Sequence, residues 1–198
     1  MINQIACYIV KKMRDNNTID EENMDMHIFG LEILLITIIK YLGLFIMALL
    51  LGVIKEAIAF IIAFSMLRIQ AGGVHLKSFW QCFIITNIIT FSCIFLSKAL
   101  PINHTPLYSV VMLIISAILV LVFAPVDTEN KRLSELEKKL YKRRSIYVII
   151  IGSIITISLG LIYNFFIIYG NIVSLGFLCE GITLTPSVLI KKECREVN

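Results

Sequence analysis

Charged residues are scarce in this chain, and their scarcity argues against a soluble globular protein. Only 16% of the 198 residues are Asp, Glu, Lys or Arg, whereas 58% are hydrophobic. An ordinary soluble domain is about 25% charged and about 45–50% apolar. The mean hydropathy of +0.88 points the same way. We therefore expect an all-α, polytopic protein of the cell membrane.

Two kinds of site motif are also missing. The five cysteines are irregularly spaced and include no CxxC pair, so neither a disulfide framework nor a zinc site is indicated. No GxxxxGK(S/T) loop is present, which excludes this common way of binding ATP. We therefore expect no metal and no cofactor. We expect most of the thiols to be reduced and to pack as small apolar side chains.

Six apolar stretches are candidate membrane spans, since a span needs about 20 residues. The second is only eleven residues long and must extend into residues 53–56 to cross a bilayer. Residues 124–145 are expected to form a polar cytoplasmic loop, with an amphipathic surface helix over 133–144, and Gly170-Asn171 to form the last turn. The expected spans, which build one bundle over residues 29–190 of a single domain (1–198), are 29–51, 57–67, 79–100, 107–123, 146–169 and 172–190.

Residues 1–17 place apolar side chains at helical spacing beside several basic residues. Ile2, Ile5 and Ile9 share one face, and Lys11 and Lys12 follow them. This stretch is too short to span, and its pattern predicts an amphipathic helix that lies in the membrane interface. Packing of the same helix against other helices is an alternative that the pattern leaves open.

The distribution of basic residues predicts the orientation. With six spans, fifteen Lys and Arg residues fall on the side of both termini, and two, Lys55 and Lys98, fall on the other side. Cytoplasmic segments carry the excess of basic residues, so both termini and segment 68–82 are expected at the cytoplasmic face. Because the basic residues lie between apolar segments, the net charge of +4 does not indicate a nucleic-acid partner.

Segment 68–82 places a histidine and a cysteine in one polar break between apolar stretches. His75 precedes Cys82 by seven residues, which is about 10.5 Å along a continuous helix, whereas proton transfer needs about 3 Å. Gly72 and Gly73 disfavour a helix and allow His75 to fold back from a loop. The imidazole would then accept the thiol proton and stabilise the thiolate, helped by the dipole of the helix that begins near Cys82.

Each of these residues also has a purely structural interpretation. Cys82 alone could be a packed small hydrophobic residue, and His75 alone could be a polar residue of the membrane interface. Cys93 and Cys179 share the apolar setting of Cys82 but have no histidine near them in the sequence. We therefore expect Cys93 and Cys179 to lie in the core.

Four blocks of sequence, spread over essentially the whole chain, have a specific order and spacing. They are Gly30-Leu31-Glu32; Arg68 with Ala71-Gly72-Gly73, His75 and Ser78-Phe79-Trp80 ahead of Cys82; residues 124–131 (Ala-Pro-Val-Asp-Thr-Glu-Asn-Lys); and residues 180–186 (Glu-Gly-Ile-Thr-Leu-Thr-Pro). In these blocks the chain resembles the accessory gene regulator protein B (AgrB) family.

The resemblance implies a bacterial membrane cysteine endopeptidase that matures a quorum-sensing propeptide. Cys82 would be the nucleophile and His75 its base. The partner would be an AgrD-type propeptide with an amphipathic N-terminal helix and an acidic C-terminal tail. Cys82 would release that tail and hold the remainder as a thioester, and a cysteine or serine of the substrate would then close a thiolactone or lactone ring. The resemblance also suggests a homodimer.

Several charged residues are candidates for supporting roles. Glu32, Lys40 and Glu180 lie within expected spans, where ionisable residues are costly and often functional. Glu32 or Glu180 is expected to orient His75 or to bind the substrate, and a snorkelling or mutually neutralised structural charge is the alternative. Arg68 is expected to bind the acidic tail, with anchoring to lipid phosphates as the alternative.

The same intramembrane charges motivate a different class of function, a small transporter or exporter of a peptide. The sequence shows no repeated half and no paired broken helices, which many transporters have. A membrane scaffold without catalytic activity is a third interpretation.

Overall fold

The computed structural model describes residues 2–16, 19, 21–73, 79–99, 105–126, 134–162 and 167–196. Within these ranges every regular element is helical, which confirms the all-α prediction. A short 3-10 turn, η1 (Glu21–Asn23), precedes the second α-helix. The α-helices are α1 (Ile2–Asp15), α2 (Met24–Leu50), α3 (Ile54–Ala71), α4 (Phe79–Ala99), α5 (Thr105–Phe123), α6 (Glu135–Ile162) and α7 (Ile167–Glu196).

Several of these helices have the length and composition of membrane spans. Four helices in the described part of the chain, α2, α4, α6 and α7, are long and apolar enough to cross a membrane. The apolar stretch of α5 is shorter. Helix α3 has 18 residues, about 27 Å at 1.5 Å per residue, and begins at Ile54, as its short apolar stretch requires. That α3 and α5 also cross the membrane, which would make six spans, remains a prediction.

The chain divides into two compact units, and the first is Met1–Gly52. Helix α1 packs against α2, with Ala6 and Val10 buried. The amide of Asn3 donates a hydrogen bond of 2.9 Å to Glu32 Oε2. Packing on α2 is the alternative that the sequence left open for this helix, while its placement in the membrane interface remains a prediction.

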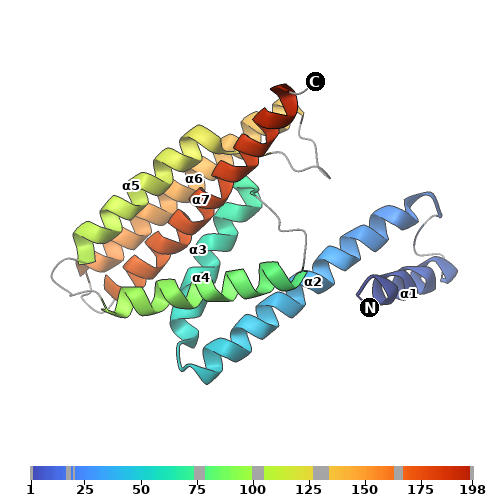
Figure 1. The fold of residues 1–198 in the computed structure, drawn as a ribbon, viewed down its shortest axis with the longest axis horizontal. Helices are drawn as coiled ribbons and strands as arrows, with labels where there is room; N and C mark the ends of the chain where they lie inside the picture. The colour runs from blue at the N-terminus through green and yellow to red at the C-terminus, as the bar shows by residue number, and fades with distance from the viewer. Residues whose placement is uncertain are drawn as a thin grey trace. The chain divides into compact units, whose positions relative to one another are not determined.

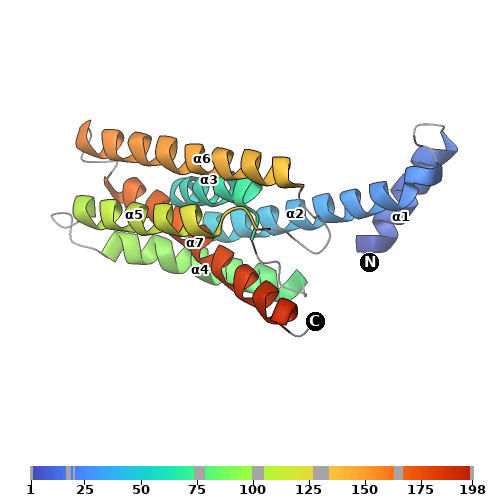
Figure 2. The same ribbon diagram turned by 90° about the horizontal axis from the view of Figure 1, so that it is seen from above.

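The second unit, Val53–Asn198, is a bundle arranged around α7. Helix α7 packs against α3, α4, α5 and α6 (Figures 1 and 2). More than half of its span is buried, whereas the other candidate spans are mostly exposed, as expected for helices that face lipid. The buried hydrophobic core of this unit consists of Ala63, Leu67, Ala71, Leu113, Val120, Ala124, Val126, Ile149, Phe177 and Leu184.

Small residues allow the close packing around α7. A side chain at Gly176 would lie 3.1 Å from the backbone oxygen of Phe60, and one at Gly152 of α6 would lie 2.5 Å from the ring of Phe177. Between membrane helices, small residues let the backbones approach closely and increase the contact area. Gly152 of α6 and Gly176 of α7 therefore serve packing.

The predicted turn at Gly170-Asn171 is wrong. Helix α6 ends at Ile162 and α7 begins at Ile167, so both residues lie inside α7. Gly170 faces α6, where a side chain would be in ordinary van der Waals contact, 3.4 Å from a methyl group of Thr156. The buried side-chain oxygen of Asn171 accepts a hydrogen bond from Ser109 of α5. Residues typical of turns are used here for helix packing.

Helix α6 also differs from the prediction at its beginning. The helix expected over residues 133–144 is not separate, because it forms the first turns of the continuous helix α6. Ser134 and Glu137 cap this helix reciprocally: the Glu137 carboxylate accepts from Ser134 N at 2.9 Å, and Ser134 Oγ accepts from Glu137 N at 3.3 Å. This capping box fixes where α6 begins.

An ion pair joins the beginning of α3 to the end of α4. Lys98 Nζ lies 2.6 Å from Glu56 Oε1. The start of α3 and the end of α4 therefore lie side by side.

Candidate functional site

The end of α3 is defined by two consecutive glycines. Helix α3 ends at Ala71, and Gly72 and Gly73 adopt φ values of +79° and +134°. Residues with a side chain rarely adopt such φ values, whereas glycine adopts them readily. The prediction that this pair interrupts the helix is confirmed.

Residues that follow α5 contact this end of α3. Val126 N donates a hydrogen bond of 2.9 Å to the backbone oxygen of Ala71. A side chain at Gly72 would lie 2.7 Å from the backbone oxygen of Val126. Ala71 and Val126 are both buried. Two main-chain segments are therefore in direct contact, and this contact leaves no room for a side chain at Gly72.

One turn before the glycines, Arg68 forms an ion pair with α7. Its Nη1 lies 3.1 Å from Glu180 Oε2 and 3.1 Å from Thr183 Oγ1. The side chain of Glu180 is 0% exposed and that of Arg68 is 20% exposed. The guanidinium also lies over the ring of Phe64, 5.7 Å from its centre. A buried carboxylate is costly unless it is paired and hydrogen-bonded, and Arg68 meets both needs.

Gly73 lies directly against this ion pair. A side chain at Gly73 would lie 2.8 Å from Arg68 Nη1, 2.8 Å from Thr183 Oγ1 and 3.1 Å from Glu180 Oε1. The pair is therefore covered by the main chain at a point two residues before His75. The structure brings together three predicted supporting residues, Arg68, Gly73 and Glu180.

The two predicted catalytic residues are less completely described. Cys82 is the fourth residue of α4, half-buried and a free thiol. Near it, Trp80 is exposed and its ring meets Phe83 edge-on at 6.4 Å, as expected for an aromatic anchor at a membrane surface. His75 lies outside the described residues, so its approach to Cys82 remains a prediction.

The described hydrogen bond of Glu32 lies within its own unit. Glu32 lies on α2 in the first unit, and its Oε2 accepts the hydrogen bond from Asn3. Its predicted role toward His75 or the substrate remains a prediction. Thr183 and Val126, to which the sequence assigned no role beyond membership of two of the blocks, contact the glycine segment. Thr183 lies one helical turn after Glu180, a spacing that could have indicated it.

Three of the four sequence blocks meet at this one place. Ala71-Gly72-Gly73 contacts Val126 of block 124–131 and contacts both Glu180 and Thr183 of block 180–186. Residues that lie more than fifty positions apart in the chain thus form one junction between α3, α7 and the segment after α5. This junction is the candidate functional site.

Cys93 and Cys179 are both half-buried, on α4 and α7. Their sulfur atoms lie 3.7 Å apart. The sequence predicted that both lie in the core, but it did not indicate that they meet.

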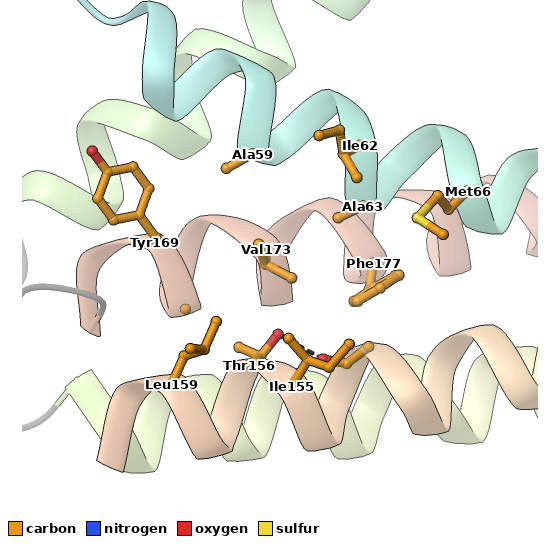
Figure 3. Close-up of a pocket in the computed structure, with 12 residues that line it drawn as sticks. Ala59, Ile62, Ala63, Met66, Ile155, Thr156, Leu159, Tyr169, Val173 and Phe177 are labelled. Carbon is orange, nitrogen blue, oxygen red and sulfur yellow. Dashed lines mark hydrogen bonds between the residues drawn. The ribbon is translucent and has the colours of Figure 1, made fainter. Parts of the chain in front are cut away.

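A separate groove opens between α3, α6 and α7 (Figure 3). Its volume is about 290 Å³, and hydrophobic residues such as Ile62, Met66 and Phe177 form most of its wall. The hydroxyl group of Thr156, another wall residue, donates a hydrogen bond of 2.7 Å to Gly152 O. The described residues of this wall include no cysteine, histidine or charged group, so the groove is distinct from the candidate site. The described residues also contain no cluster of three or more potential metal ligands.

Comparison with known proteins gives consistent matches over most of the chain. A family model described as Accessory gene regulator B matches residues 2–184. A putative AgrB-like protein of Clostridium perfringens (strain SM101 / Type A) is 28% identical, covering 96% of this chain and 95% of that protein. The accessory gene regulator protein B of Staphylococcus aureus (strain bovine RF122 / ET3-1) is 29% identical, covering 97% and 96%. No solved structure matches the chain significantly.

Proposed function

Because the chain belongs to the accessory gene regulator B family, we propose that it is a membrane-embedded cysteine endopeptidase of peptide quorum sensing. Its substrate is an AgrD-type precursor of an autoinducing peptide. The enzyme removes the C-terminal tail of this precursor and promotes closure of a thiolactone or lactone ring.

Cys82 and His75 carry out the first step. His75 accepts the proton of the Cys82 thiol, and the sulfur attacks a backbone carbonyl of the propeptide. The C–N bond breaks, the imidazolium gives its proton to the leaving nitrogen, and the acidic tail departs. The position of Cys82 in the first turn of α4 supports this step, because the positive end of a helix dipole stabilises a thiolate.

The second step closes the ring. A thiol or hydroxyl group of the bound substrate attacks the thioester carbonyl, and Cys82 is released as a thiol. Forming a thioester from an amide is energetically uphill, so turnover depends on loss of the tail and on exclusion of water from the acyl-enzyme. A tethered nucleophile has a high effective concentration, which favours ring closure over hydrolysis.

One observation carries this proposal: three of the four sequence blocks are in contact at Ala71-Gly72-Gly73. The ion pair of Arg68 and Glu180, with Thr183, forms a buried support for the main chain just before His75. We assign Arg68 to positioning this segment and not to binding the acidic tail, because Glu180 and Thr183 already engage its Nη1 atom. Gly72 and Gly73 supply the reversal that returns His75 toward Cys82.

The location and assembly of the enzyme belong to the same proposal. The protein crosses the cell membrane several times, with both termini and the active site on the cytoplasmic side, and it works as a homodimer. Exposed basic residues at the start of α6, among them Lys142, Arg143 and Arg144, would lie at that face. They suit an acidic propeptide tail that approaches along the membrane surface.

A covalent intermediate provides the direct test. The purified enzyme is incubated with a panel of AgrD-type propeptides, and its intact mass is measured after acid quenching. We expect a propeptide fragment attached to Cys82 and removable by hydroxylamine, as a thioester is. Cys82→Ala should carry no such adduct, whereas the matched control Cys7→Ser should carry it. Release of the tail by Cys82→Ala would overturn the proposal.

A further inference from the structure

The contact between Cys93 and Cys179 has no role in the proposed cleavage. The two sulfurs lie 3.7 Å apart, on helices α4 and α7, and the residues are 86 positions apart in the chain. Both side chains are half-buried. By contrast, the Cys7 thiol donates to Asn3 of its own helix. Cys93 and Cys179 are therefore a dithiol that spans two helices.

The separation of these sulfurs is short enough for a covalent bond to form with little movement. A disulfide needs about 2.05 Å, so the sulfurs must approach by about 1.7 Å, the difference from 3.7 Å. Rotation about the Cα–Cβ bonds and a small shift of α4 against α7 can supply this approach. The geometry thus favours pairing of these two thiols.

We propose that Cys93 and Cys179 are a redox modification site that a small hydroperoxide converts into an interhelix disulfide. Half-buried thiols in a membrane are accessible to a small neutral oxidant. This inference does not rest on the endopeptidase activity, because neither thiol takes part in the acyl-transfer steps.

The reaction balances as a two-electron oxidation. The first sulfur attacks one peroxide oxygen, the O–O bond breaks, and the departing oxygen takes the thiol proton and leaves as water. The first cysteine is then a sulfenic acid. The second sulfur attacks it, the S–O bond breaks, and the departing hydroxide takes the second thiol proton as another water. Two thiols and one hydrogen peroxide give one disulfide and two waters.

The disulfide would join two helices that matter to the candidate site. Helix α4 carries Cys82 in its first turn, and α7 carries Glu180 immediately after Cys179. A covalent bond between Cys93 and Cys179 would fix the position of α4 against α7. The redox state of this pair would thereby control how far the helix of the nucleophile can shift relative to the ion pair beneath Gly73.

The test uses the full chain with the other cysteines replaced (Cys7→Ser, Cys82→Ala, Cys194→Ser), reconstituted in detergent micelles or liposomes. After treatment with hydrogen peroxide, we expect the intact mass to fall by two hydrogen atoms. A non-reducing digest should contain one linked peptide with Cys93 and Cys179, and a reductant should separate it. The unfolding temperature should rise on oxidation and return on reduction.

A matched control keeps the number of thiols constant. In the same background, Cys179→Ser with Leu178→Cys turns the sulfur by about 100° around α7, and no linked peptide is expected. The same linked peptide is sought in the unmodified protein, so the result does not depend on how the variants fold. Oxygen addition to both thiols without linkage, linkage only between two protein molecules, or equal linkage in the control would overturn the proposal.

Discussion

Arg68 on α3 and Glu180 on α7 form an ion pair, with 3.1 Å between Nη1 and Oε2, although 112 residues separate them in the chain. Glu180 is completely buried, and Gly73 lies against both side chains. The pair therefore connects the core of the bundle to the segment that leads to His75. Its disruption should affect stability and activity in separable ways.

Replacing Arg68 with alanine should destabilise the protein by about 3–5 kcal/mol, because removing one partner of a buried ion pair leaves an uncompensated charge. Arg68→Ala/Glu180→Leu removes both charges and should recover much of the thermal stability. Cleavage should stay low in both variants, with kcat falling more than KM rises. Thermal unfolding in detergent and steady-state cleavage of a propeptide measure the two effects. Full activity in the double variant would contradict a positioning role.

Gly73→Ala should reduce cleavage by about a hundredfold, since a misplacement of about 1 Å near a reacting group can have this effect. The added methyl group would lie 2.8 Å from Arg68 Nη1, at a backbone φ of +134°. Gly160→Ala is the matched control, because nothing lies within 4 Å of a side chain at that helical position. This control should cleave normally and gain up to about 1 kcal/mol of stability. Equal activity of the two variants would contradict the proposal.

Cys82→Ala and His75→Ala should each lower tail removal by at least about a thousandfold, as expected for members of one catalytic unit. Cys82→Ser should retain little activity, because a serine hydroxyl is far harder to deprotonate. Combining Cys82→Ala with His75→Ala should cost no more than either change alone. Cleavage is followed by mass spectrometry, and membrane insertion by fractionation. Additive losses would indicate that the two residues act independently.

Glu56→Gln should lower the unfolding temperature by about 1–3 °C at about pH 7, the size expected for a partly exposed ion pair. Lys98 Nζ lies 2.6 Å from the Glu56 carboxylate, and protonation of that carboxylate in acid removes the charge that attracts Lys98. Thermal unfolding of both proteins between about pH 7 and pH 3 should show the difference disappear. A difference that persists in acid would contradict this assignment.

The sequence predicted those helices, and helix ends, that a short stretch of residues determines by itself. The apolar stretches located most of α2, α4 and α5, and the paired glycines marked the end of α3. The last turn was misplaced because Gly170 and Asn171 have the same local preferences in a turn and in a tight helix contact. Only the packing partners, Thr156 and Ser109, distinguish the two cases.

The candidate site was predictable as a set of residues but not as an arrangement. Each of three residues was expected to matter: Glu180 as a charge within a span, and Arg68 and Gly73 as parts of the polar segment that leads to Cys82. Their mutual contact depends on how α3 and α7 pack, which no local pattern encodes. The same holds for Cys93 and Cys179, whose contact joins two helices far apart in the chain.

The hydrogen bond from Val126 to Ala71 has an evolutionary consequence, because it joins two main chains. A link of this kind does not depend on which side chain stands at position 126, so many apolar replacements there should preserve it. Position 72 has no such freedom, since any side chain would collide with the carbonyl of Val126. We therefore expect the residue at position 126 to vary among divergent relatives, and the residue at position 72 to remain glycine.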